Sequence, residues 1–250
     1  MQTKHTLTSL TPDATISQII SADKQAGELL ASIGLTLKDH EGETLRSVCQ
    51  QRQWSEVEVL EWVKKQRESE NIESSPDEEL PDFEKNLKRW SEYLKKTFIQ
   101  PNRILLKKLN NDFPRVLKVH GNQYPRLKTM QWYFNTFEET LKLFYRFENE
   151  KFYPLAEQLE SRKMYKINYG IVSKLKKSLT IIKEDQQRLI ELMDVLQEKA
   201  QDFEHPAISC STLRILNKNF ENLFTKVRLQ FNLESQKIIP LIKGRVSENG

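Results

Sequence analysis

Two glutamates, Glu148 and Glu234, stand where buried apolar side chains are expected. Each belongs to an eight-residue stripe whose members recur at steps of 4, 3, 4, 3, 4, 4 and 3, the spacing of the inward face of an amphipathic helix. Every member of the second stripe lies 86 residues after its counterpart in the first, which indicates an internal duplication. The stripes are Met130, Phe134, Phe137, Leu141, Phe144, Glu148, Phe152 and Leu155, and Leu216, Phe220, Leu223, Val227, Gln230, Glu234, Ile238 and Leu241.

The two acids define the chemistry that this pattern could support. A carboxylate on an apolar stripe costs several kcal/mol unless it is paired, protonated or bound to a metal. Two carboxylates aimed at one bundle centre are the arrangement used by di-iron carboxylate bundles, which also need imidazoles. The residues one turn before the acids are Phe144 and Gln230, neither of them histidine. Two interpretations stay open: residual metal ligation, or carboxylates that reach solvent or pair with a Lys or Arg of a neighbouring helix.

Four long segments of helical periodicity carry and surround the stripes. Short connections between long helices imply antiparallel neighbours, so the sequence predicts an up-and-down four-helix bundle. A proline at position 101 predicts a bend in the first of them. The segments run from about 83 to 119, 125 to 159, 169 to 203 and 211 to 243.

A smaller unit precedes the bundle. We expect an all-α chain with a small helical domain over residues 1–65, an acidic linker over 66–82 and the bundle over 83–250. The linker carries seven acids against one arginine, and two prolines. Capping boxes begin at Thr15 and Ser55, Gly34 is typical of a helix end, and four short helices are expected. The predicted core is Ile19, Leu29, Leu30, Ile33, Leu45, Val48, Val57, Leu60 and Val63.

Composition excludes several functions. The net charge of +4 is spread along the chain, which argues against nucleic-acid binding. The sequence has no apolar run long enough to predict a membrane span, and its start does not resemble a signal peptide. Its two isolated cysteines favour free thiols in the cytoplasm. The chain also lacks a phosphate-binding glycine loop, a zinc-protease motif and a nucleophile elbow. We therefore expect a cytoplasmic protein that is not an enzyme.

Three features together resemble the iron–sulfur cluster repair (Ric) family: the stretch HGNQYP, the paired endings ENEKFYPL and ESQKIIPL, and the small leading domain. The resemblance covers about residues 15–243 and implies a short N-terminal domain joined to a hemerythrin-like di-iron bundle. The family's N-terminal domain carries G-[IL]-D-[FY]-C-C-G-G and a later cysteine. Here Lys38 and Asp39 replace the cysteine pair, His40 follows them, and only Cys49 matches. A surface histidine and a core cysteine are expected at the last two positions.

The resemblance also implies a reduced set of metal ligands. His120, Glu148 and Glu234 match family ligands, whereas Ile99, Phe144 and Gln230 stand where the family has histidines. A loop or capping role beside Gly121 is the alternative for His120.

The expected function follows from these losses. The resemblance, together with these losses, implies a divergent repair-like protein without the standard di-iron centre, acting as a binding or regulatory protein in nitrosative or oxidative stress. No cofactor is expected, with iron as the candidate if the residual site binds, and a protein partner or a second copy is the expected partner. The alternatives are an active metal-binding repair protein and a helical interaction module that dimerises through its N-terminal domain.

Overall fold

The computed structural model describes residues 10–70, 83, 86–161, 169–201 and 210–248, which form helices and turns with a single isolated bridge between Thr15 and Thr44. The all-α prediction is confirmed. Contacts divide the chain into two compact units, Met1–Glu78 with Phe203–Phe220, and Glu79–Asp202 with Glu221–Gly250.

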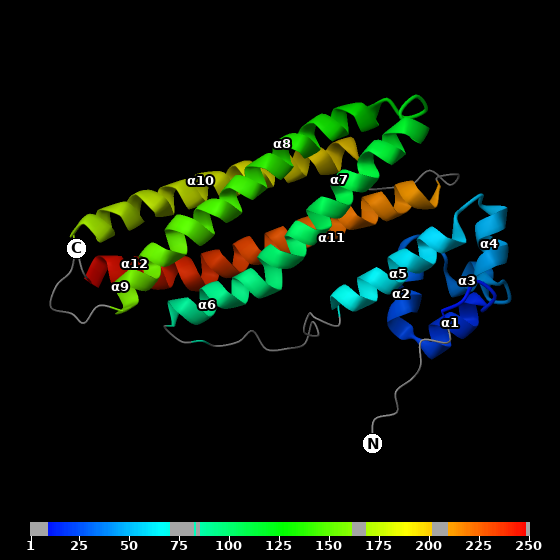
Figure 1. The fold of residues 1–250 in the computed structure, drawn as a ribbon, viewed down its shortest axis with the longest axis horizontal. Helices are drawn as coiled ribbons and strands as arrows, with labels where there is room; N and C mark the ends of the chain where they lie inside the picture. Colours follow the sequence, from blue (N-terminus) through cyan, green and yellow to red (C-terminus); the bar gives the residue numbers. More distant parts are fainter. Residues whose placement is uncertain (1–9, 71–82, 84–85, 162–168, 202–209, 249–250) are drawn as a thin grey trace, which may run out of the picture. The chain divides into compact units, whose positions relative to one another are not determined.

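Over residues 10–70 the first unit contains five short helices rather than the four expected. They are α1 (Ile16–Ala22), α2 (Lys24–Ser32), α3 (Leu37–His40), α4 (Leu45–Gln51) and α5 (Glu56–Glu70), shown in blue and cyan in Figure 1. The capping box at Thr15 is present with Gln18. Gly34 ends α2 at a φ of +85°, a conformation in which glycine is favoured because it lacks a Cβ.

The boundaries of this unit differ from those expected from sequence. Helix α5 continues to Glu70, so residues 66–70 are helical, while 71–82 of the expected linker lie outside the described residues. Residues 203–220, which include the start of α11 (Ser211–Leu233), belong to this unit, and Ile215 packs in its core. The expected core is buried except for Val57, which is exposed; Val59 occupies the core instead.

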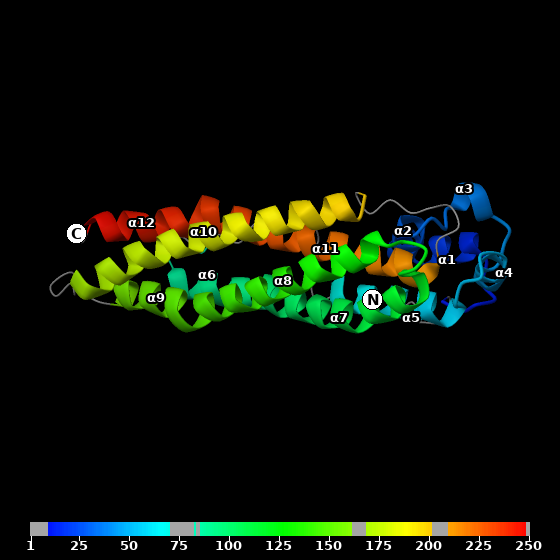
Figure 2. The ribbon, with the colours of Figure 1, turned by 90° about the horizontal axis from the view of Figure 1, so that it is seen from above.

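The second unit is built from four helical rods, which lie side by side in Figures 1 and 2. Five-residue π-helical segments, labelled η, interrupt three of them. The rods are α6 (Leu87–Leu94), η2 (Lys95–Ile99) and α7 (Gln100–His120); α8 (Arg126–Phe147), η3 (Glu148–Phe152) and α9 (Tyr153–Ser161); α10 (Tyr169–Lys199); and, from Glu221 onward, α11, η4 (Glu234–Ile238) and α12 (Ile239–Glu248).

Hydrogen bonds between rods define their directions. Three side chains of the first rod bond to the second: Ser91 to Glu157, Asn102 to Tyr145 and Asn110 to Glu138. Residue numbers rise along the first rod while those of the partners fall along the second, so the two rods are antiparallel. From the third to the fourth, Gln186 bonds Glu234 and Asp194 bonds Arg228, again antiparallel. No helix in the described part of the chain combines the length and apolar content that a bilayer crossing requires.

Candidate functional site

Both stripes face the interior of the second unit, apart from the first members of the second stripe, which belong to the first unit. Every stripe residue is buried except Leu155 and Leu241 at the ends, which are half-buried. Glu148 is 0% exposed and Glu234 is 2% exposed. The expectation that these carboxylates reach solvent is therefore wrong, because the apolar residues around each acid exclude water from it.

Each glutamate opens a π segment, and a proline follows each segment at the same place. In η3 and η4 the residue just before the proline, Tyr153 or Ile239, donates its N–H to the carbonyl of the glutamate five residues earlier. The segment η2 is followed by Pro101 in the same way. A proline inside a regular α-helix lacks one N–H and clashes with the carbonyl four residues before it. The wider π turn changes which backbone N–H and carbonyl groups face each other at this point. Such π bulges recur at functional sites.

Three side chains direct donor groups at the carboxyl pair. The hydroxyl of Tyr153 lies 3.2 Å from Glu234 Oε1 and 3.4 Å from Glu148 Oε1. The amide nitrogen of Gln230 lies 2.8 Å from Glu234 Oε1 and 3.3 Å from Glu148 Oε2. Gln186, from α10, donates to Glu234 Oε2 at 2.6 Å. The pair is thus held by amide and phenol donors rather than by the Lys or Arg that the sequence suggested.

The two carboxyls also interact with each other. Burial raises the pKa of Glu148 well above 4.5, and the neighbouring charge of Glu234 raises this pKa further. Burial also raises the pKa of Glu234, but hydrogen bonds from Gln230, Glu148, Tyr153 and Gln186 oppose that rise. The donors that favour a carboxylate therefore gather on Glu234 and oppose the effect of burial on its pKa.

The first rod adds a second buried polar contact one turn away. Asn102, 0% exposed, donates to the hydroxyl of Tyr145 at 2.7 Å. Burial raises the pKa values of Tyr145 and Tyr153 well above 10, so both phenols stay protonated. All four rods thus contribute to one layer of buried polar side chains. We call this set the polar layer: Asn102, Tyr145, Glu148, Tyr153, Gln186, Gln230 and Glu234.

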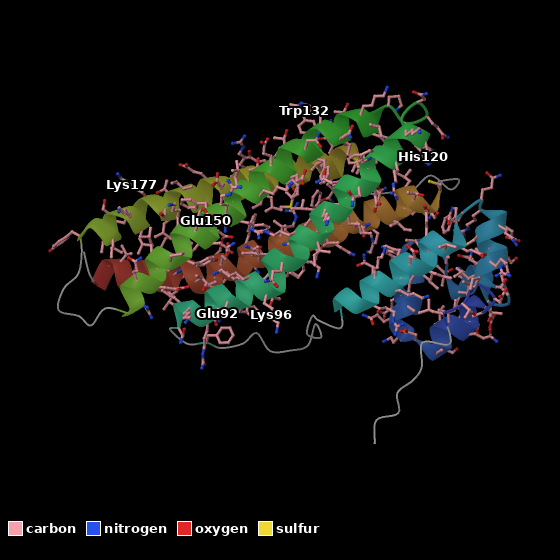
Figure 3. The ribbon with its side chains drawn as sticks, in the orientation of Figure 1. Glu92, Lys96, His120, Trp132, Glu150 and Lys177 are labelled. Carbon is pink, nitrogen blue, oxygen red and sulfur yellow. The ribbon has the colours of Figure 1, made fainter. Side chains whose placement is uncertain are left out.

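His120 lies elsewhere. It is the last residue of α7, and its ring lies tilted beside that of Tyr124, with 6.2 Å between ring centroids. Asn102 and His120 are 18 residues apart on one helix, so about 27 Å of helix axis separates His120 from the polar layer. Figure 3 shows His120 at one end of the rods, far from Glu150 in the π segment of Glu148. The structure therefore brings together Glu148 and Glu234 of the predicted ligands, but not His120.

The donor set at the pair does not fit a binuclear iron centre. Two octahedral ions require about ten to twelve donor atoms, in which imidazole and carboxylate dominate. The lone pairs of the two carboxyls are directed instead at Tyr153, Gln186 and Gln230. Phe144 fills the position one turn before Glu148, with its ring 5.3 Å from that of Phe231. Among the described residues no cluster of three or more His, Cys, Asp or Glu side chains has metal-binding geometry.

The small domain also departs from the expectation. His40 is 9% exposed rather than a surface histidine, because Glu43 and Arg52 hold its two ring nitrogens. Cys49 is in the core as expected, and both cysteines are free thiols. Burial raises the pKa of Cys49 to about 11, which makes it a poor nucleophile.

Sequence reasoning did not identify Gln186, Tyr153, Tyr145 and Asn102 as parts of the site. Gln186 carried a usable signal, since it interrupts a buried apolar stripe on α10 just as the glutamates interrupt theirs. Tyr153 follows directly after its stripe member Phe152, and only the wider turn brings it inward. A search of protein-family models and of curated proteins found no match to this chain.

Proposed function

We propose that the protein is a divergent relative of the iron–sulfur cluster repair family in which a proton-sharing carboxyl pair replaces the di-iron centre. It acts as a binding or regulatory protein of nitrosative or oxidative stress in the cytoplasm, and it is not an enzyme. The observation that carries the proposal is the pairing of Glu148 with Glu234, the acids of two duplicated stripes. The replacement of family histidines by Phe144 and Gln230 supports the loss of the metal.

The repeated geometry supports descent from a site with two equivalent halves. Each glutamate begins a π segment, and a Pro-Leu pair stands six and seven residues after each of them. Both glutamates are buried in the second unit. Packing alone does not require two acids there, because apolar residues of similar volume are often equally or more stable at buried positions.

Metal content of the whole chain tests the proposal. Protein purified from iron-supplemented cells is expected to hold far less than one iron per chain, and a chelator should leave its thermal stability unchanged. Two irons per chain, with an oxo-bridge absorption band, would overturn the proposal.

A gain of binding tests why metal is excluded. The double variant Phe144→His with Gln230→His restores two imidazoles one turn before the acids and should raise iron affinity. The matched control is Leu143→His with Gln236→His, which places two histidines on the exposed faces of the same rods. Equal iron content in both double variants would contradict the proposed geometry.

A second candidate is a single-ion site on the same acids. The amide oxygen of Gln230, wholly buried, has no hydrogen-bond partner among the described residues. If the Gln230 amide turns over so that this oxygen faces the pair, it and the two carboxyls offer three donor groups after loss of the shared proton. One firmly held metal per chain, lost in Glu234→Gln, would favour this candidate.

The partner is proposed as a protein or a second copy of the chain. Light scattering over a range of concentrations distinguishes these two. A strict monomer at all concentrations would exclude dimerisation through the small domain.

A further inference from the structure

Positive charge is concentrated on the first rod of the second unit. Residues 87–120, which form α6, η2 and α7, contain nine Lys or Arg and two Asp or Glu, a net charge of +7, whereas the whole chain carries +4. The second, third and fourth rods hold five cations against six acids, six against five, and five against three. The charge therefore belongs to this one rod and is not spread evenly over the chain.

Six of these cations share one exposed stripe along the rod. Its nine positions follow one another at steps of 4, 4, 4, 3, 4, 4, 4 and 3, starting at Lys88, so each helical turn contributes one. The wider turn of η2 accommodates the consecutive steps of four. Figure 3 shows two neighbouring members, Glu92 and Lys96, on the same side of the rod. We call these positions the basic stripe, and its cations are Lys88, Lys96, Arg103, Lys107, Arg115 and Lys118.

The basic stripe has few acids and faces solvent. Its other three positions are Glu92, Gln100 and Asn111, and all nine side chains are exposed. In the part of the chain that the structure describes, none of the six cations forms an ion pair with a carboxylate. Lys142 on the second rod, by contrast, pairs with Glu138. The stripe thus presents a row of positive charges that its own surroundings do not neutralise.

The spacing of the row favours one shape of partner. Lys88 and Lys118 are 30 positions apart, which corresponds to about 45 Å of helix axis with one stripe position every 5.4 Å or so. A helix with acids at steps of three and four residues presents a carboxylate at the same pitch. Two such helices can therefore lie side by side with opposite charges matched turn by turn.

Other polyanions match the basic stripe less well. A duplex nucleic acid curves away from a straight rod and would contact only part of the row. A single strand is held largely by aromatic side chains on which its bases stack, and the stripe contains none. A helix bound in a membrane interface buries its apolar face in lipid, whereas the apolar residues of this rod, such as Leu94 and Leu106, are buried in the protein.

We infer that the basic stripe binds an acidic helix of a protein partner. Single exposed ion pairs contribute little, but a matched row adds several of them and accelerates association. This inference specifies the protein partner of the proposed function and rests on it only in that respect. Iron content tests the carboxyl pair and peptide binding tests the stripe, so either can fail alone.

Fluorescence anisotropy of labelled peptides with the full chain tests the stripe. One synthetic helical peptide of about 30 residues carries glutamates at steps of three and four on one face, and an isomer carries the same glutamates spread around the helix. The first peptide should bind saturably and more tightly, and sodium chloride should weaken its binding. No binding, or equal binding of the two peptides, would overturn the inference. Tighter binding of duplex DNA or of phosphatidylserine vesicles would assign another partner and also overturn it.

A triple variant locates the peptide on the first rod. Lys96→Gln, Arg103→Gln and Lys107→Gln together should weaken binding at least about threefold, the lower limit for three exposed ion pairs. Unchanged affinity would contradict the site. Light scattering of the same variant excludes another occupant: a loss of self-association relative to the natural chain would mean that a second copy occupies the stripe.

The matched control changes three exposed cations of the third rod and alters the net charge of the chain equally. It combines Lys176→Gln, Lys183→Gln and Arg188→Gln. This variant should bind the peptide like the natural chain. An equal loss in both triple variants would show that only the total charge matters and would contradict the basic stripe as a site.

Discussion

The hydroxyl of Tyr153 lies 3.2 Å from a carboxyl oxygen of Glu234, although 81 positions separate the two residues. The counterpart of Tyr153 in the duplicated half, 86 residues later, is Ile239. Two acids that are equivalent by sequence therefore meet unequal surroundings. This inequality gathers the donors that favour a carboxylate on Glu234, and the raised pKa of Glu148 gives the polar layer a measurable dependence on pH.

Glu148→Gln should remove that dependence, because an amide mimics the protonated carboxyl. The pKa of Glu148 is raised in the folded protein, so above pH 4.5 the folded chain binds more protons than the unfolded chain. Its stability therefore falls as pH rises from about 4.5 toward the folded pKa, by about 1.4 kcal/mol per pH unit for one proton. The advantage of Glu148→Gln over the natural protein should grow with pH in urea unfolding at pH 5, 6, 7 and 8.

The control for this series is Glu150→Gln, which changes an exposed acid in the same π segment. Its difference from the natural protein should stay nearly constant over the series. A constant difference for Glu148→Gln as well would mean that the pair titrates normally.

Tyr153→Phe should destabilise the protein by about 1–3 kcal/mol, since it removes a buried donor that spans both carboxyls. The loss should be larger at pH 8 than at pH 5, because the hydroxyl favours the charged form of Glu234. Urea unfolding measures both values. Tyr169→Phe, on a side chain that is 78% exposed, should change stability little at either pH. A similar effect of both substitutions would exclude a specific role for the Tyr153 hydroxyl.

The prolines allow a comparison within one chain. Pro114 lies inside regular α-helix, where a proline costs about 3 kcal/mol, so Pro114→Ala should stabilise by up to about that amount. Pro154 follows a π segment that already accommodates its ring, so Pro154→Ala should change stability by less than about 1 kcal/mol. Thermal unfolding of both variants checks this order, and the reverse order would show that the π segment does not relieve the clash.

Asn219→Ala should destabilise the small domain. Its side-chain oxygen accepts from Trp62 Nε1 at 3.4 Å and from Gln66 Nε2 at 3.1 Å, and all three groups are buried. Leaving two buried donors unpaired costs roughly 1–3 kcal/mol each. Hydrogen exchange of α5 amides should rise in this variant. Thr212→Ala, which removes an exposed bond to Glu58, is the control with little expected change.

Cys49 should resist alkylation in the folded protein. With a pKa of about 11, about one thiol in a thousand is ionised at pH 8. Iodoacetamide with mass spectrometry should show Cys210 modified first, and Cys49 only after urea unfolding. Modification of both at one rate in the folded state would contradict the buried environment.

The sequence predicted the elements better than the contacts between them. Periodicity identified the rods and the two stripes, because helical spacing is a local property. It placed Val57 in the core and His40 on the surface, since neither the neighbouring elements nor the side chains of Glu43 and Arg52 are visible in a linear pattern. The share of the small domain contributed by residues 203–220 depends on contacts such as those of Asn219 with Gln66 and Trp62, over 153 and 157 positions, which no local rule specifies.

The candidate site was predicted only in part, because a linear pattern shows the two acids but not the side chains that contact them. The two acids carried a strong signal because charge on an apolar stripe is costly. The donors around them did not, because phenol and amide side chains are compatible with either a surface or a core position. The resemblance placed His120 among the ligands, but the helical rise separates it from Asn102 of the polar layer by about 27 Å.

The wide turns set a condition on any redesign of this scaffold. A π turn contains one residue more than the α turn it replaces, so residues on either side of it follow two different phases of the helical wheel. A rod grafted with a single heptad assignment would rotate its second half by about 100°, one residue of the helical wheel, and turn apolar side chains toward water. Chimeras of this protein should therefore exchange segments at the loops, with Glu148–Phe152 or Glu234–Ile238 carried over whole.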